Sequence, residues 1–405
     1  MAHAGSVQQR FDEPAAHVNH AMNAARFFAA LLVVVFHLRT LFVEDYASAS
    51  NPEPFATVAY AVMSLGHQAV IVFFVLSGFW VGGSVIRSLR RGGFSAARYA
   101  NARLVRLWLV LVPAIVLTLI LDAVGRWSAP ASDIYLGSSA YHALIPEEGI
   151  ASRTSVLTAF GNLLFVQDVY VPTLGSNSPL WSLAVEFWYY LAFPAVLVLF
   201  WPGVARSTRI SAGLVTLGAI VVLAAGPLTH GARVFELAPT WAAGAALAAL
   251  RAPILVSLSR LSTASLECLR WVLGAAVLAA AVVDSRIWTT TTTYLLALLT
   301  AVWLATLIPD LRVGWVRRGL IPFSWAAGWS YSLYAIHLPV LALMAAMIVP
   351  TADERWSMNP TTALMCLGIC AVPVGAAILF WLAFERNTDR FRHWMSRTRA
   401  KAELR

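Results

Sequence analysis

Long apolar windows separated by short polar gaps dominate the chain. Ten of them are long enough to cross a bilayer, because about 20 apolar residues in a helix span its hydrocarbon core. They lie at 24–43, 60–86, 102–122, 180–201, 209–228, 233–250, 268–284, 288–308, 323–348 and 362–385. Backbone polar groups in lipid must find partners within the protein, so such windows fold as helices. The pattern therefore predicts an all-α polytopic membrane helix bundle of about ten transmembrane helices.

The composition agrees with a membrane environment. Of the 405 residues, 59% are hydrophobic and only 12% are charged, and the mean hydropathy is +0.71. A water-soluble domain carries about 25% charged residues, so the lipid bilayer is the expected partner of this chain. Residues 1–20 are polar and no small-residue cleavage site follows the first apolar window. We therefore expect that window to be retained as a membrane span.

The basic residues indicate the orientation of the helices. The net charge is +9, and Lys401 is the only lysine among the 29 basic residues. With the N terminus placed inside, most of them fall in the cytoplasmic gaps, where positive charge concentrates in membrane proteins. The short gap around Arg233 is the exception. We expect both termini to be cytoplasmic, and this placement of charge argues against nucleic acid as a partner.

The same pattern divides the chain into three parts. A cytoplasmic segment at 1–23 precedes the transmembrane domain at 24–385, and a basic cytoplasmic tail follows at 386–405. A long extracytoplasmic loop at 123–178 carries an apolar stretch, 155–166, that is too short to span the bilayer. We expect that stretch to form either a lid or a re-entrant element.

Four ionisable residues inside the apolar windows stand out: Arg26, His37, Glu186 and His337. Each costs about 2.5–3.5 kcal/mol at the centre of a membrane helix, so each needs a reason. Arg26 and His37 share a helix face about 16 Å apart. Counted from the ends of their windows, the two histidines and Glu186 fall into one layer about 20 Å from the cytoplasmic side. They form either a catalytic site, in which Glu186 pairs with a histidine, or separate hydrogen-bonded struts between helices.

The three cysteines, Cys268, Cys366 and Cys370, do not form a disulfide framework. Cys366 and Cys370 lie one helical turn apart, but no further ligand is close to them in the sequence. We interpret them as small apolar packing residues and expect no metal site.

Five segments, taken in order, resemble those of the acyltransferase 3 family of bacterial membrane acyltransferases. They are the arginine–ten residues–histidine motif at Arg26 and His37, AVIVFFVLSGFW (69–80), the R-x-x-R run at Arg103 and Arg106, NSPLWSLAVEFWYYLAFP (177–194) and GWSYSLYAIHLPV (328–340). Two positions depart from the family pattern. Ile71 stands where many members carry an acidic residue, and in FERNTDR (384–390) Asn387 occupies the proline position of the usual E-R-P.

The resemblance implies transfer of an acyl group, most often acetyl, from acyl-CoA to a sugar hydroxyl of a surface glycan or its lipid-linked precursor. Acyl-CoA is then a co-substrate, no cofactor stays bound, and the location is the bacterial cytoplasmic (inner) membrane. Such a transfer needs a base and a stabilised oxyanion. We expect His37 to be the base, Glu186 to orient it, and His337 to donate to the oxyanion or to assist proton movement.

The resemblance also implies a set of substrate-binding residues. Arg26, Arg103 and Arg106 fit the phosphates of coenzyme A, although Arg103 and Arg106 also obey the positive-inside rule by themselves. Ser77 is expected to line the channel for the acyl donor and not to act as a nucleophile. The remaining members of the set are Trp181, Ser182, Ser330 and Tyr334. The neighbouring aromatic residues of the fourth window, Trp188, Tyr189 and Tyr190, are assigned mainly to the aromatic belt at the membrane interface.

Two other functions fit the same pattern. A proton-coupled transporter or flippase of a glycan or lipid would use buried histidine and glutamate for proton relay, and it predicts inverted repeats. A membrane scaffold without catalysis would tolerate the loss of His37. The sequence leaves the acceptor, the acyl chain, the side on which transfer ends and the oligomeric state open.

Overall fold

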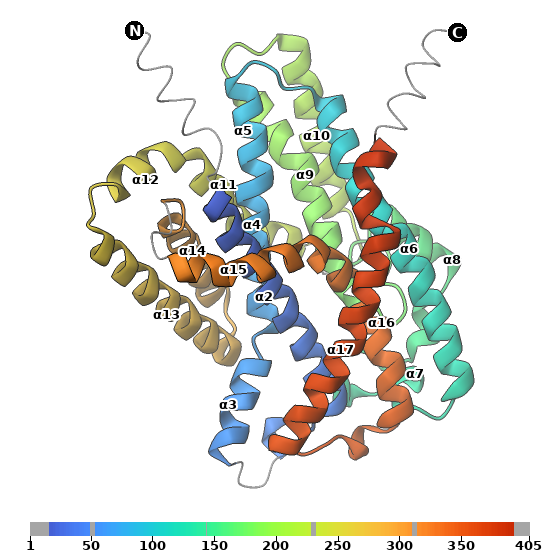
Figure 1. Ribbon diagram of the computed structural model, residues 1–405. Coiled ribbons are helices and arrows are strands. Elements are labelled where there is room, and N and C mark those ends of the chain that lie inside the picture. The colour runs from blue at the N-terminus through green and yellow to red at the C-terminus, as the bar shows by residue number, and fades with distance from the viewer. Residues whose placement is uncertain (1–15, 49–52, 143, 228–231, 310–313, 393–405) are drawn as a thin grey trace.

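The computed structural model describes residues 16–48, 53–142, 144–227, 232–309 and 314–392, and shows a bundle of helices (Figure 1). Within these residues there is no strand, only two isolated bridges, Val43 with Trp356 and Gln167 with Val171. The α-helices are α2 (Ala16–Phe42), α3 (Pro54–Met63), α4 (Gly66–Ser77), α5 (Gly83–Arg90), α6 (Ala96–Ser128), α7 (Asp133–Leu136), α8 (Val156–Leu163), α9 (Trp181–Phe200), α10 (Arg206–Ala224), α11 (Ala232–Ala249), α12 (Arg251–Leu258), α13 (Thr263–Ile287), α14 (Thr290–Thr306), α15 (Gly314–Ala326), α16 (Ser330–Ile348) and α17 (Pro360–Ala383).

The predicted all-α membrane bundle is confirmed. In the described part of the chain, eight helices are long and apolar enough to cross a membrane, and a ninth span counts α11 and α12 together across a bend of 65°. The predicted window at 288–308 forms α14, which has 17 residues and is shorter than the others. Each of the ten predicted windows thus contains an apolar helix, and α14, at 17 residues, lies at the lower limit of length for a membrane span.

The helix ends gather at two opposite ends of the bundle, and which of these ends faces the cytoplasm stays a prediction. In Figure 1 the α5–α6 turn, the α9–α10 turn and the end of α17 lie at the same upper end of the bundle. The opposite end is tied together by contacts between loops. The backbone N–H of Trp356 donates to Phe42 O (2.8 Å), and the carboxylate of Asp133 accepts from the N–H of Ala352 (2.9 Å). Of the predicted terminal segments, residues 1–15 and 393–405 lie outside the described part, so the domain boundaries stay predictions.

Helix α4 crosses α11 at nearly direct backbone contact. A Cβ atom placed on Gly78 would lie 1.9 Å from the carbonyl oxygen of Trp241, and one on Gly244 would lie 1.9 Å from that of Val75. Gly78 opens a π-helical turn, η2 (Gly78–Gly82), which connects α4 to α5. Single π-turns of this kind occur often at functional sites. The close approach places Ser77 and Trp241, one on each helix, beside each other.

Replacing Gly244 with alanine is expected to destabilise the protein. The new methyl group meets backbone atoms of α4, which cannot turn away as a side chain can. Overpacking of a tight contact typically costs about 1–3 kcal/mol, so the melting temperature in detergent should fall. Gly218→Ala in α10 is the matched control, because nothing lies within 4 Å of its added Cβ. Equal melting temperatures for both variants would contradict the contact.

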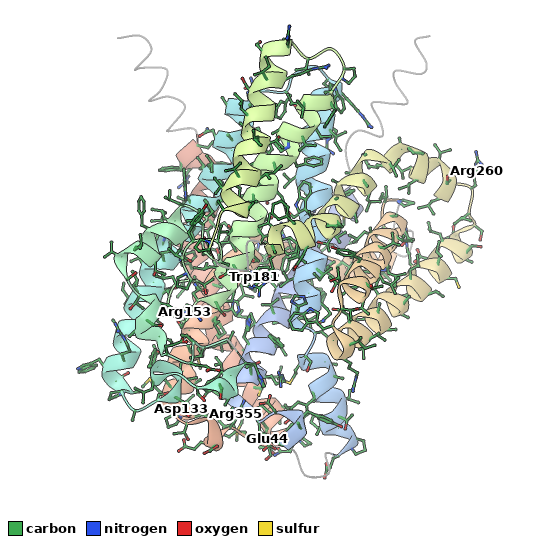
Figure 2. All side chains as sticks on the ribbon, turned by 180° about the vertical axis from the view of Figure 1, so that it is seen from behind. Glu44, Asp133, Arg153, Trp181, Arg260 and Arg355 are labelled. Carbon is green, nitrogen blue, oxygen red and sulfur yellow. The ribbon has the colours of Figure 1, made fainter. Side chains whose placement is uncertain are left out.

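The loop predicted at 123–178 begins later than expected, because α6 extends to Ser128, and its second half folds back into the bundle; we call residues 155–180 the re-entrant element. Its apolar stretch forms the short helix α8, and Trp108, in the middle of α6, donates its indole N–H to the carbonyl oxygen of Leu163 at the end of α8 (3.0 Å). The irregular chain that follows is buried, and Gln167 and Asn177 are 1% and 0% exposed. Figure 2 places Trp181, where α9 begins, at mid-height of the bundle, well above Asp133 at its lower end.

Side chains satisfy the backbone of this re-entrant element, as irregular structure at membrane depth requires. Asn162 donates to Pro172 O (3.0 Å) and accepts from the N–H of Leu174 (3.2 Å). The carboxylate of Asp122, on α6, accepts from the N–H (3.0 Å) and the hydroxyl (2.6 Å) of Ser176. Asn177 donates to Ala335 O on α16 (2.9 Å). These contacts hold the start of α9 against α6 and α16.

Candidate active site

Two histidines meet between α2 and α16. His37 Nδ1 lies 2.7 Å from His337 Nε2, and the two rings stack with their centroids 5.0 Å apart. Both are buried, with 9% and 0% of their surface exposed. Nearer the start of both helices, the Arg26 guanidinium donates to the carbonyl oxygen of Ala327 (2.6 Å). Polar contacts therefore join α2 at two depths to α16 and to the turn that precedes it.

The hydrogen bonds assign the protons of the neutral pair. His337 Nδ1 lies 2.9 Å from Tyr334 O and 3.1 Å from Leu333 O. A carbonyl oxygen can only accept, so His337 carries its hydrogen on Nδ1, and its Nε2 is an acceptor. His37 must then donate from Nδ1 to that nitrogen. The lone pair of His37 Nε2 is left available, which is the state a general base needs.

A cavity of about 460 Å³ lies on the Arg26 side of the histidine pair, between α2, α4, α6, α9 and α16. Residues from sequence positions far apart converge on it. Among the residues predicted from the sequence, those that line it are Arg26, Ser77, Arg103, Arg106, Ser182, Glu186, Ser330 and Tyr334. The structure therefore brings the predicted arginines and Glu186 into one space.

Tyr334 stands between this cavity and the histidine pair. It lines the cavity, and its ring centroid is 5.9 Å from that of His337. Its hydroxyl accepts from Ser182 Oγ (2.6 Å) and donates to Pro179 O (3.3 Å). The ring of Phe73 meets it edge-on at 5.9 Å. Both ends of the tyrosine side chain are thus held in place, and its phenol forms the wall that the histidines share with the cavity.

Glu186 belongs to a polar cluster within the cavity. Its carboxylate accepts from the hydroxyl of Ser77 (2.6 Å) and from the hydroxyl of Tyr190. The indole N–H of Trp241, on α11, donates to Ser77 Oγ (3.2 Å). Side chains from three helices thus surround the Glu186 carboxylate. They supply the hydrogen bonds that a buried carboxyl group needs, whether it is ionised or protonated.

The expected contact between Glu186 and a histidine is not what the structure shows. Ser182 contacts Tyr334, which lies about one turn before His337, and Glu186 lies a further turn along α9 toward the cytoplasm. Glu186 is therefore about two turns from the histidine layer. The depth estimate assumed that the fourth window begins at the membrane surface. Helix α9 instead begins deep in the bundle, after the re-entrant element.

The arginines of α6 lie at the cytoplasmic part of the cavity. Arg103 donates to Ser84 Oγ (3.1 Å), and its guanidinium lies over the rings of Tyr99 (5.5 Å) and Tyr190 (5.7 Å). Arg106 lines the cavity and has no hydrogen-bond or ion-pair partner among the described residues. Its guanidinium is thus available to an anion that enters the cavity.

Trp181 does not line the cavity as the other predicted residues do. Its ring lies 6.2 Å from Phe74, a cavity residue, and the guanidinium of Arg233 covers it at 5.1 Å. Arg233 also pairs with Asp168 (3.4 Å). These contacts explain why an arginine occurs in this gap against the charge pattern, because its charge is paired and stacked.

The assignment of the neighbouring aromatic residues to the interface belt was wrong. Trp188 Nε1 donates to Phe165 O (3.1 Å), and the hydroxyl of Tyr189 donates to Val234 O (2.7 Å). Tyr190 bonds to Glu186. Their polar groups are used inside the bundle, where the re-entrant element, α11 and Glu186 each supply one acceptor.

Four residues of this region were missed from the sequence: Tyr190, Trp241, Tyr331 and Glu385. Tyr190 had a usable signal, since it follows Glu186 by four residues and so shares its helix face. Tyr331 is adjacent to the predicted Ser330 and lines the cavity. Glu385 had a signal as well, because it is the glutamate of FERNTDR at the position of the E-R-P pattern. Trp241 carried no signal, because only the packing of α11 brings it here. No group of metal-binding side chains occurs within the described ranges.

Comparison with known proteins agrees with the resemblance in the motifs. The model of the acyltransferase 3 family, described as an acyltransferase domain, matches residues 19–381. The acyltransferase MdmB of Streptomyces mycarofaciens is 29% identical over 179 residues, which cover 43% of this chain and 38% of that protein. The O-acetyl transferase of Shigella phage Sf6 is 30% identical over 181 residues, which cover 43% of this chain and 45% of the phage protein.

The chain thus spans less than half the length of the curated relatives it matches. No solved structure matches it. The family match, in contrast, runs from the beginning of α2 almost to the end of α17 and includes every motif on which the resemblance rests. The chain belongs to the acyltransferase 3 family.

Proposed function

We propose that this protein is a membrane-bound O-acyltransferase. It moves an acyl group, most simply acetyl, from acyl-CoA to a hydroxyl of a cell-surface or exported glycan or its lipid-linked precursor. The observation that carries the proposal is the free lone pair of His37 Nε2 just beyond an arginine-lined cavity. The names of the two relatives, one an acyltransferase and one an O-acetyl transferase, support the reaction class. Their bacterial and phage sources support a bacterial inner membrane.

The proposed reaction uses the hydrogen bond between the two histidines, which leaves His37 Nε2 free to accept a proton. The acceptor hydroxyl gives its proton to His37 Nε2 while its oxygen attacks the carbonyl carbon of the thioester. The tetrahedral intermediate then expels the sulfur of coenzyme A, which takes the proton from the His37 imidazolium. An ester and free coenzyme A are the products, and His37 returns to its starting state.

His337 acts on His37 and not on the substrate. By accepting from Nδ1–H, it holds the imidazole in the tautomer whose Nε2 is basic, and it stabilises the imidazolium when that forms. The backbone carbonyls at its own Nδ1 hold it in turn. This revises the expectation for Glu186, which bonds to Ser77 and lines the cavity that we assign to the acyl donor.

The cavity is suited to the acyl donor. Arg26 and Arg106 present guanidinium groups, which match phosphate oxygens in shape and charge. Arg26 and His37 are eleven residues apart on α2, which is about 16 Å along a helix. A phosphate group at the arginines and a thioester near the histidines therefore require an extended, flexible arm between them, which coenzyme A has.

The Arg106→Ala variant is expected to bind acyl-CoA more weakly. Loss of a charge-assisted contact of about 1.5–3 kcal/mol should raise KM for acyl-CoA by roughly 10- to 100-fold, with a small change in kcat. Steady-state kinetics at several acyl-CoA concentrations measure this change. The matched control is Arg98→Ala, an exposed arginine near the start of the same helix. A fall in kcat at unchanged KM would remove Arg106 from the binding site.

The proposed function is tested by reconstitution. The purified protein in proteoliposomes is supplied with acetyl-CoA labelled in the acetyl group and with glycan extracted from the host surface. We expect label in the glycan as an alkali-labile ester, with release of one free thiol for each ester formed. The absence of transfer from acetyl-, propionyl- and succinyl-CoA would count against the proposal. Glycan movement across the membrane without thiol release would instead indicate a transporter.

A further inference from the structure

The helix that carries His337 begins at an unusual junction. Helix α15 runs across the bundle in Figure 1, and α16 then turns along it. A short 3₁₀ turn, η7 (Ala327–Trp329), joins them, and α16 starts at Ser330. The first turn of any helix has backbone N–H groups without intrahelical partners, and inside a membrane protein these need a specific acceptor.

Glu385 supplies that acceptor from the far end of the chain. It opens η9 (Glu385–Asn387), directly after α17, and its carboxylate accepts from both the backbone N–H (3.2 Å) and the hydroxyl (2.6 Å) of Ser332. A carboxylate at this position satisfies one unpaired N–H and interacts favourably with the positive end of the helix dipole. Glu385 is thus an N-terminal cap for α16 that comes from another helix.

Arg26 holds the same junction from the opposite side. Its guanidinium donates to the carbonyl oxygen of Ala327 (2.6 Å). His37 follows Arg26 by eleven residues, and His337 follows Ala327 by ten, so the two helices advance by similar lengths of about 15–16 Å between the two contacts. The position of the junction therefore sets the height at which His337 Nε2 meets His37 Nδ1.

We propose that Glu385 is a positioning residue for the histidine pair. With Arg26 it fixes the register of α16 against α2, so that the bond between His337 and His37 forms with the geometry that leaves His37 Nε2 basic. This inference rests on the proposed function, since it assigns the register a role in acyl transfer. It also gives the arginine–ten residues–histidine spacing a structural meaning, which is a match in length to the segment from Ala327 to His337.

A different role for Glu385 makes a different prediction. Arg26 and Arg106 are its nearest cationic neighbours. If Glu385 served only to balance their charge, its removal would change the affinity for an anionic acyl donor. The effect would then be a change in KM for acyl-CoA. A positioning role appears in kcat, because the chemical step depends on the alignment of the histidines and not on the binding of the donor.

The test compares Glu385→Gln and Glu385→Ala with Asp389→Asn in the full-length protein. Asp389 is exposed and lies four residues further along, so Asp389→Asn removes the same charge away from the junction. We expect kcat to fall roughly 10- to 100-fold in Glu385→Ala and less in Glu385→Gln, whose amide oxygen still accepts, with no rise in KM for acyl-CoA. Ser332→Ala, which removes the hydroxyl partner, should lower kcat in the same direction and add little to Glu385→Ala.

Hydrogen exchange provides a readout that does not depend on activity. Amides at the start of α16 should exchange faster in Glu385→Ala than in the wild type, while those of α4 stay unchanged. Wild-type kcat, or a change confined to KM, in a Glu385→Ala protein that transfers acyl groups would overturn the positioning role. A wild-type protein without any transfer would contradict the proposed function instead, and exchange at α16 that is unchanged in Glu385→Ala would contradict the cap.

Discussion

Replacing His37 with alanine is expected to lower kcat for acyl transfer by about 10²- to 10⁴-fold, the usual contribution of a positioned general base. The side chain is 9% exposed and makes one side-chain hydrogen bond, to His337, so its loss removes the base without disturbing the cavity that holds the acyl donor. KM for acyl-CoA should change little. Initial rates of labelled ester formation in proteoliposomes measure the effect.

The control for this variant is His142→Ala, because the side chain of His142 is 64% exposed and pairs with Asp45 at the outer end of the bundle. It should transfer at the wild-type rate. Size-exclusion profiles and melting temperatures must match the wild type for both variants, since a buried histidine also contributes packing. A correctly folded His37→Ala protein that transfers at the wild-type rate would show that His37 is not the base.

Replacing His337 is expected to reduce kcat in a way that depends on the new side chain. Leucine fills a similar volume but cannot accept from His37 Nδ1–H, and it leaves that buried donor without a partner, so we expect a loss of about 10²-fold or more. Glutamine can place its amide oxygen near the position of Nε2 and should restore part of the rate. The ratio of the two kcat values is the measurement.

The double variant gives a further test of the pair. If His337 acts only through His37, then His37→Ala with His337→Leu should be no slower than His37→Ala alone, because the two residues work as one unit. Losses that multiply would mean that His337 contacts the substrate independently. Equal rates for His337→Leu and His337→Gln would contradict the proton assignment that we derive from the contacts of its Nδ1.

The membrane architecture could be predicted because hydropathy is a property of local sequence. Windows such as 24–43 and 362–385 match α2 and α17 closely, since a long apolar segment has few alternatives to a helix in lipid. The windows 233–250 and 288–308 likewise match α11 and α14. Hydropathy did not predict the 65° bend between α11 and α12, because a bend depends on packing.

The re-entrant element shows how an error in depth reaches the site. The short apolar stretch at 155–166 was recognised, but its depth was not, and this misplaced the start of α9. Glu186 was consequently assigned to the layer of the histidines, whereas its hydroxyl partners, Ser77 and Tyr190, lie in the cavity below. An error of two helical turns in the depth of Glu186 therefore led to the wrong hydrogen-bond partner being predicted for His37.

The composition of the site was already evident in the chain. Arg26, His37, Glu186 and His337 stood out because each is costly in lipid and therefore needs a purpose, and that cost depends only on the residue and its apolar surroundings. Which of them touch depends on the rotation and depth of separate helices, and these follow from contacts such as Arg26 with Ala327 and Glu385 with Ser332. The proton on His337 Nδ1 follows from carbonyl oxygens within α16 itself, but the free lone pair on His37 Nε2 is fixed only once α2 and α16 are packed together.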